Sequence, residues 1–117
     1  MAVYSRQLLS GSTNGKPIPV VAIVTIGTTI HTAVAGAASF DELYCWVTNV
    51  TGAAATLTIE WGAAGTGSQM TTSYSIPANS APTQIVFGQV LQNGLLCTMF
   101  SSVASALNIT GFVNRIV

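Results

Sequence analysis

Charged side chains are nearly missing from this chain of 117 residues. Lysine and arginine together number 3, aspartate and glutamate together number 3, and the net charge at pH 7 is +0. Only 5% of the residues are charged, whereas soluble domains usually contain about 25%. Three basic residues are too few to neutralise a phosphate backbone, which argues against nucleic acid as a partner. A surface with no net charge does not repel copies of itself and so favours association.

Long hydrophobic runs are also missing. The longest apolar stretch, 18–26, has nine residues and contains Pro19 and Thr25, whereas a membrane-spanning helix needs about 20. The first ten residues contain no apolar core of the kind found in a secretory signal peptide. We therefore expect a soluble, unprocessed chain with no membrane partner.

Residues that carry catalysis are scarce. The single histidine, His31, would have to combine with Asp41 and one of eleven serines to form a Ser-His-Asp site, and no G-x-S-x-G motif marks a nucleophile. We interpret His31 as a cross-strand polar residue at a sheet edge. Asp41 and Glu42 would point to opposite faces of a strand. We interpret these two carboxylates and Glu60 as solvated or interface charges.

Metal ligands are equally sparse. The two cysteines, Cys45 and Cys97, are far apart and lack the paired spacing of a zinc site, and three acidic residues are few for calcium. Each cysteine lies in an apolar run, which favours buried free thiols over a disulfide. We predict no catalytic residue, metal ligand or cofactor, and hence no enzyme.

A period of two runs through most of the chain and predicts β-strands. In 40–50, Leu43, Cys45 and Val47 share a face with Asp41 and Asn49, opposite the face of Tyr44 and Trp46. In 55–61, an apolar face alternates with a threonine-rich face that also holds Glu60, which we expect to be exposed. The turn signal at 51–54 predicts that these two strands form a hairpin.

Further strands are expected at 18–26, 29–34, 70–76, 83–91, 95–101 and 107–117. The run 18–26 is continuous and rich in β-branched residues, so we expect it to be well buried. Asn93-Gly94 favours a type I′ turn and predicts a second hairpin. No segment keeps a helical period. About eight strands predict an all-β fold, a single antiparallel β-sandwich that is jelly-roll-like or immunoglobulin-like.

Residues 1–17 differ from the sandwich domain predicted over 18–117. Tyr4, Arg6 and Leu8 share one face of a short alternating segment, and 10–15 has the composition of a flexible tether. This arm either pairs as an edge strand of its own sandwich or reaches a neighbouring subunit, so the same three residues are our candidate subunit or capsid contacts.

Several short motifs resemble small virion proteins of tailed bacteriophages. They are Arg6-Gln7-Leu8, the run D-E-L-Y-x-W-x-T-N at 41–49, L-T-I-E-W-G at 57–62, and N-I-T-G-F-V-N-R-I at 108–116. The resemblance implies a β-sandwich capsid decoration (cement) protein that binds across capsomers and stabilises the phage head. It would be made in the host cytoplasm and placed on the head surface as a homo-oligomer, with a trimer favoured, against the major capsid protein or other virion proteins.

Two alternatives remain open from the sequence. The second hypothesis, after the decoration protein, is a collar, tail or fibre-base component of the virion. A glycan-binding attachment module would stack sugars on Trp46 or Trp61. Both tryptophans lie in strongly apolar runs, so we interpret them as core residues.

Overall fold

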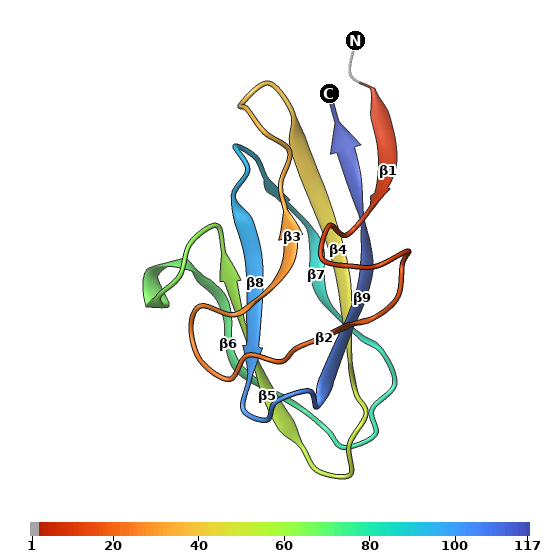
Figure 1. Ribbon diagram of the computed structural model, residues 1–117, viewed down its shortest axis with the longest axis vertical. Coiled ribbons are helices and arrows are strands. Elements are labelled where there is room, and N and C mark those ends of the chain that lie inside the picture. Colours follow the sequence, from red (N-terminus) through yellow and green to blue (C-terminus); the bar gives the residue numbers. More distant parts are fainter. Residues whose placement is uncertain (1–2) are drawn as a thin grey trace.

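Two antiparallel sheets pack face to face, as the sequence predicts (Figure 1). The computed structural model describes residues 3–117. One sheet contains β1 (Tyr4–Leu8), β2 (Ile18–Pro19), β9 (Leu107–Ile116), β4 (Phe40–Asn49) and β7 (Thr83–Leu91). The other contains β3 (Thr28–Thr32), β8 (Leu96–Ser101), β5 (Ala55–Trp61) and β6 (Gln69–Ile76). Within these residues the one helical element is a 3₁₀ turn, η1 (Thr66–Ser68), and no helix is long and apolar enough to span a membrane.

The strand order distinguishes the two predicted topologies. The sheets run β1-β9-β4-β7 and β3-β8-β5-β6, so consecutive strands alternate between sheets almost throughout, as in a jelly roll. An immunoglobulin sandwich instead keeps several consecutive strands within one sheet. In the part of the chain described, only β5 and β6 are consecutive strands that pair with each other.

Both hairpins predicted from turn signals are wrong. The 51–54 turn leads from β4 in one sheet to β5 in the other, and the Asn93-Gly94 turn leads from β7 to β8 in the same way. The turn chemistry itself is confirmed, because Asn93 and Gly94 have φ angles of 59° and 67°, as a type I′ turn requires. A tight turn therefore reverses the chain here without pairing the strands that it joins.

The core lies between the sheets, and the alternation predicted for β4 is confirmed. Leu43, Cys45 and Val47 are fully buried. They join one apolar cluster with residues of the opposite sheet such as Leu57 and Ile59. Trp61 packs against this cluster, in agreement with its interpretation as a core residue. Trp46 does not, because it lies half-buried on the outer face of its sheet.

The run 18–26 is the largest departure from the predicted strands. Only Ile18 and Pro19 pair, with β9, and the chain then forms a loop up to β3. Isolated hydrogen bonds hold this loop. The amides of Val21 and Ala22 both donate to Thr28 Oγ1 at 3.1 Å, and Ser101 N donates to the carbonyl oxygen of Ala22 at 3.0 Å. These backbone groups have their partners outside a strand ladder, so the segment forms a loop. Val20 is buried in the core, but Val21, Ile23, Val24 and Ile26 point into solvent.

The amino-terminal strand is one half of an interrupted edge strand. β1 pairs with the 112–116 end of β9, and β2 pairs with the 108–109 end of the same strand. Between them, residues 9–17 leave the sheet and cross to β3, where Gly11 N donates to Ile30 O at 3.0 Å. β1 and the end of β9 lie side by side in Figure 1, and Val3 N donates to Val117 O at 2.8 Å.

Candidate functional site

The structure places the predicted contact residues Tyr4, Arg6 and Leu8 on β1, at the edge of the five-stranded sheet. Tyr4 is 70% exposed and Leu8 is 55% exposed. The guanidinium carbon of Arg6 lies 4.4 Å from the centre of the Phe112 ring, a cation–π contact with the neighbouring strand. These residues therefore lie beside an aromatic row on the outer face of the sheet.

The aromatic row consists of Tyr44, Trp46 and Phe112. The Tyr44 and Phe112 ring centres are 5.0 Å apart with an interplanar angle of 17°, and those of Trp46 and Phe112 are 6.1 Å apart at 30°. The rings thus turn their faces towards one another, and Arg6 stacks on Phe112 as well. Because its faces are occupied within the chain, Phe112 offers no open platform for a stacked sugar.

A buried ionic cluster joins three strands at the start of β4. Asp41 is fully buried within the chain, so its interpretation as a solvated or interface charge is wrong. Arg115 of β9 binds it through both ends of the guanidinium, Nε to Oδ1 at 2.8 Å and Nη2 to Oδ2 at 3.0 Å. His31 of β3 approaches Oδ2 with Nε2 at 2.8 Å, and Val34 N donates to the same oxygen at 3.0 Å. A buried carboxylate is thereby fully paired.

The hydrogen bonds fix the tautomer of His31. Its Nδ1 accepts the backbone N–H of Ser10 at 3.0 Å, so the proton of the neutral ring lies on Nε2 and is donated to Asp41. A catalytic triad instead places a serine hydroxyl against the ring. Here the Ser10 hydroxyl oxygen accepts from Thr32 N at 2.6 Å, and His31 is only 1% exposed. His31 does lie on an edge strand, as we expected, but it is buried and ties three segments together.

The ionisation of this cluster follows from burial and charge. Burial lowers the pKa of His31 below its ordinary value and outweighs the opposing effect of Asp41. Burial alone would raise the pKa of Asp41, but the hydrogen bonds from Arg115 and His31 outweigh it and lower that pKa. At neutral pH the cluster therefore contains a carboxylate, a guanidinium and a neutral imidazole.

A second buried carboxylate, Glu60 of β5, has no cationic partner. Its interpretation as a solvated or interface charge is also wrong, because it is fully buried within the chain. Its Oε1 accepts from Gly27 N at 2.9 Å and from the Thr98 hydroxyl at 3.0 Å. Its Oε2 accepts from the Thr25 hydroxyl and from Gly65 N at 3.1 Å. Burial raises its pKa, but these four donors outweigh that effect and hold the pKa below its ordinary value.

The hydrogen bonds of Glu60 explain why the outer face of β5 is covered by other parts of the chain. The 20–27 loop and the 62–65 turn both bond to its carboxylate, so they close over the outer face of the four-stranded sheet. Thr58 on the same face is buried as well. The threonine-rich face of β5 is thus not the solvated surface that its alternation predicts.

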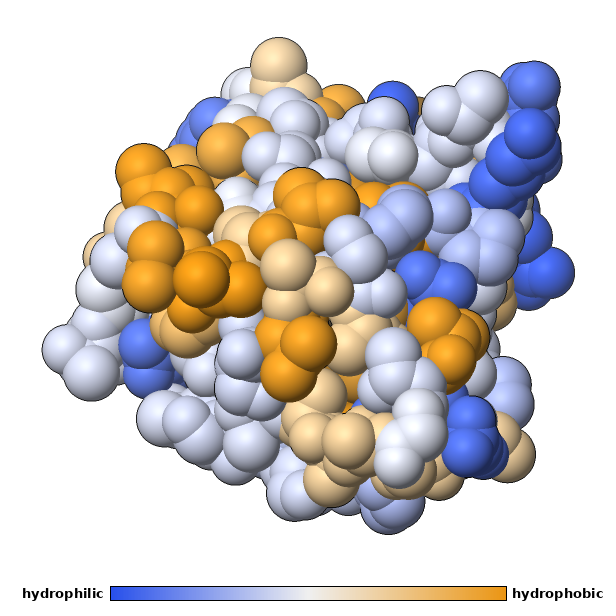
Figure 2. Space-filling view, turned by 60° about the horizontal axis from the view of Figure 1, so that its bottom comes forward, coloured by the Kyte–Doolittle hydropathy of each residue, from blue (hydrophilic) through white to orange (hydrophobic). Residues whose placement is uncertain are grey.

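The loop that Glu60 holds presents a group of exposed aliphatic side chains. Val24 is 65% exposed and Ile26 is 69% exposed. We call this surface the apolar end, and it comprises Val21, Ile23, Val24 and Ile26 with Val103 of the adjacent β8–β9 connection. Figure 2 shows apolar side chains gathered on the face that carries this loop. A shallow hollow of about 120 Å³ lies beside Ile26, lined also by Gly62–Ala64 and Leu96.

The apolar end has a defined shape because its loop is fixed at several points. Gly27 donates to Glu60 and passes so close to β8 that an added Cβ would lie 2.4 Å from the carbonyl oxygen of Met99. No charged residue occurs in 18–27 or in 101–107. The sequence did not reveal this surface, because a continuous apolar run is equally typical of a buried strand and nothing in it marks Glu60 as its partner.

The remaining surface carries very little charge. Asp41 and Glu60 are buried, and Arg115 is paired with Asp41. Of the six charged residues, this leaves Arg6, Lys16 and Glu42 for the surface. The exterior is therefore even more neutral than the composition indicates.

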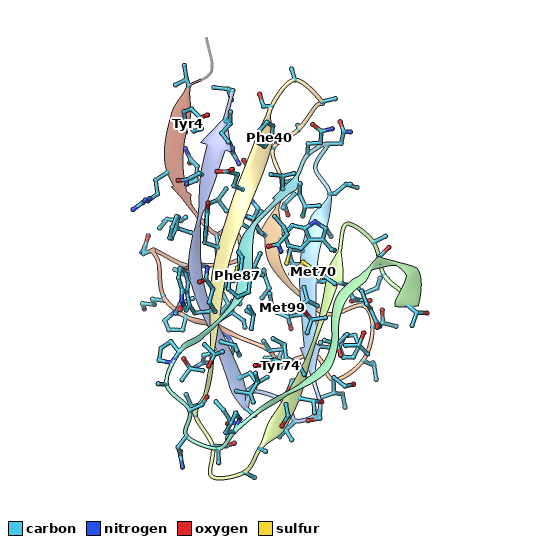
Figure 3. All side chains as sticks on the ribbon, turned by 180° about the vertical axis from the view of Figure 1, so that it is seen from behind. Tyr4, Phe40, Met70, Tyr74, Phe87 and Met99 are labelled. Carbon is cyan, nitrogen blue, oxygen red and sulfur yellow. The ribbon has the colours of Figure 1, made fainter. Side chains whose placement is uncertain are left out.

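The open side of the sandwich lies between the edge strands β6 and β7. A hollow of about 220 Å³ is lined there by Tyr74 and Phe87, among others. Figure 3 shows Phe87 on β7, with Tyr74 and Met70 on β6. The edge of β7 bonds to its own side chains: Gln84 Nε2 donates to Val86 O at 3.2 Å, and Phe87 N donates to Gln89 Oε1 at 2.7 Å. Such bonds reduce the tendency of an edge strand to pair with another chain.

The two cysteines are free and buried, as predicted. Burial raises the pKa of Cys45 to about 12 and also raises the pKa of Cys97. Neither thiol is poised for chemistry, because the reactive form is the thiolate. Within residues 3–117, no three side chains of histidine, cysteine, aspartate or glutamate gather as a metal site.

Comparison of the chain with protein-family models, curated proteins and solved structures found no match. The basis for assigning a function is therefore the chemistry of its own residues, foremost the apolar end.

Proposed function

We propose that this protein is a non-enzymatic structural protein of a tailed-phage virion, a capsid decoration (cement) protein that docks through its apolar end. The observation that carries the proposal is a fixed loop of exposed aliphatic side chains that ends at Ile26. Its sequence contains no charged residue, and the carboxylate that holds it, Glu60, is fully buried. Contiguous exposed apolar surface of this kind marks interaction sites. The partner is an uncharged apolar surface, which we assign to the major capsid protein.

The energetics suit a component present in many copies. Fully burying one valine or isoleucine contributes about 1.5–3 kcal/mol relative to exposure, and the side chains of the apolar end begin roughly half exposed. One contact of this kind binds modestly. Repeated contacts within a homo-oligomer, with a trimer favoured, raise the apparent affinity by avidity without new contacts.

Two further observations support the proposal. The surface leaves only Arg6, Lys16 and Glu42 as free charges, so neighbouring copies on a particle do not repel one another. The jelly-roll order is recurrent in viral capsid proteins and in lectins. A fold does not decide function, and the mutual stacking of the aromatic row favours the capsid assignment over the glycan-binding one.

The docking surface is tested by changing it without changing the core. Val24→Lys and Ile26→Lys place a charge on the apolar end, and Val90→Lys is the matched control on the outer face of the other sheet, where Val90 is 50% exposed. We expect binding to virions stripped of the protein to fall at least tenfold for the first two variants and to be unchanged for the third. Equal binding by all four proteins would overturn the proposed docking surface.

Head and tail locations are separated by copy number. A decoration protein is present in hundreds of copies per particle, whereas a collar, tail or fibre-base component follows ring symmetry and numbers about a dozen. Quantitative mass spectrometry of purified virions against the major capsid protein measures this ratio. A value near a dozen would replace the cement assignment with the collar or tail alternative.

A further inference from the structure

The crossing segment after β1 is held by the only histidine of the chain. Leu9 is buried in the core, Ser10 N donates to His31 Nδ1 at 3.0 Å, and the Ser10 hydroxyl oxygen accepts from Thr32 N. The strand before it contributes little burial, since Tyr4 and Leu8 are more than half exposed. Leu9 and Ser10 therefore anchor the crossing segment, while β1 itself is held by its pairing with β9 and by the Arg6–Phe112 contact.

We propose that His31 and Ser10 form an acid-sensitive latch that holds β1 and its crossing segment closed at neutral pH and releases them when His31 is protonated. The bond depends on a ring nitrogen that accepts. Protonation places an N–H on Nδ1, so two donors, the ring N–H and the Ser10 N–H, point at each other and the hydrogen bond is lost.

The groups around His31 determine whether its protonation favours the open or the closed segment. Asp41 of β4 favours the protonated ring, while Arg115 of β9 disfavours it and already occupies both oxygens of Asp41. Cys97 lies opposite His31 in the β3–β8 register, and its raised pKa keeps it neutral in acid. Burial of the ring outweighs the attraction of Asp41, so a proton on His31 favours the open segment, where the ring is solvated.

The consequence for the molecule is local. Opening exposes Leu9 and frees the Leu8 end of β1, while the rest of the sandwich keeps its core and the Glu60 cluster. Below the ordinary histidine pKa of 6.5, the open fraction rises by up to about tenfold per pH unit, until the ring is also protonated in the closed form. The released segment leaves one edge of β9 unpaired.

Trypsin detects this opening directly. Arg6-Gln7 lies within β1, and the next possible site, Lys16, precedes a proline and resists cleavage. The rate of cleavage after Arg6 is measured between pH 7.5 and 5.5 and is normalised to an unfolded peptide of residues 3–12. We expect the normalised rate to rise by up to about tenfold per pH unit below 6.5. A rate that does not change with pH would overturn the latch.

His31→Gln is the matched variant, because glutamine also donates and accepts but does not titrate in this range. We expect its normalised cleavage rate to be independent of pH. A second measurement uses the wild-type chain alone: the single imidazole gives one NMR titration curve, and the Ser10 amide should follow it. A ring that titrates at or above pH 6.5, or a Ser10 amide that stays constant while the ring titrates, contradicts the proposal.

Discussion

Asp41 and Glu60 are both fully buried, yet the partners that hold them differ in kind. Asp41 binds a guanidinium and an imidazole, which join β3, β4 and β9. Glu60 binds two backbone amides and two threonine hydroxyls, all of them neutral. The first cluster contains a histidine, whose ordinary pKa of 6.5 is lowered by burial, and the second contains no histidine. The amino-terminal segment is thus held in a pH-dependent way, whereas the loop of the apolar end is held independently of pH until Glu60 itself is protonated.

Asp41→Asn should have the largest effect on stability. The change leaves Arg115 and His31 without a negative partner, and breaking a buried ion pair from one side costs about 3 kcal/mol or more. Glu42→Gln is the control, because the neighbouring carboxylate is only half-buried and forms no ion pair with any of residues 3–117. Urea denaturation at pH 7 measures both free energies of unfolding. A loss below about 1 kcal/mol for Asp41→Asn would contradict the structural importance of the pair.

Glu60→Gln should cost less, about 2 kcal/mol. In glutamine an amide nitrogen, which only donates, replaces one carboxylate oxygen. Each oxygen accepts from one backbone N–H and one threonine hydroxyl, and the hydroxyl can reverse its role while the backbone N–H loses its acceptor. No cation is left unpaired, which is why the loss is smaller than for Asp41. The loosened loop should also weaken virion binding at pH 7. Unchanged binding with reduced stability would show that Glu60 does not shape the apolar end.

The pH dependence of stability distinguishes the clusters without mutation. His31 has a lowered pKa in the folded chain, so its contribution is complete above its ordinary value of 6.5 and is lost as pH falls towards the folded value. Asp41 and Glu60 also have lowered pKa values, and their contributions are lost below ordinary values of 3.8 and 4.5. We expect the free energy of unfolding to fall by up to about 1.4 kcal/mol per pH unit just below pH 6.5. In His31→Gln the fall in the free energy of unfolding just below pH 6.5 should vanish. The fall caused by protonation of Asp41 and Glu60 at lower pH should remain.

The thiols provide the smallest expected effect. Cys45 and Cys97 are buried, free and uncharged, so reductant should leave the melting temperature unchanged. A thiol reagent should label neither cysteine in the folded protein and both after unfolding. A fall of several degrees with reductant would reveal a disulfide instead.

Local alternation predicted much of the fold but little of the candidate site. The faces of β4 followed from its period of two, including Asp41 on the inward face with Leu43 and Cys45. That placement was a signal for a buried carboxylate, although the partners Arg115 and His31 lie on strands far apart in the sequence. The apolar end was missed because 18–26 is apolar throughout, and what keeps it a loop is a contact with Glu60 more than thirty residues away.

The strand pairing was misjudged for a related reason. Turn residues such as Asn93 and Gly94 determine local backbone angles, and these were predicted correctly. Whether the strands on either side of a turn then pair depends on which other strands each of them pairs with. β4 pairs with β9 and β7, and β5 pairs with β8 and β6. Such choices depend on contacts between distant segments that a single sequence does not display.

Residue-resolved hydrogen exchange at pH 6.5 and 5.0 tests the contrast between the two clusters most directly. Ser10 N donates to His31, whereas Gly27 N and Gly65 N donate to Glu60. After correction for intrinsic exchange, we expect the protection of Ser10 to fall by up to about tenfold per pH unit while that of both glycines stays constant. Equal loss at all three amides, or no loss at Ser10, would contradict the account.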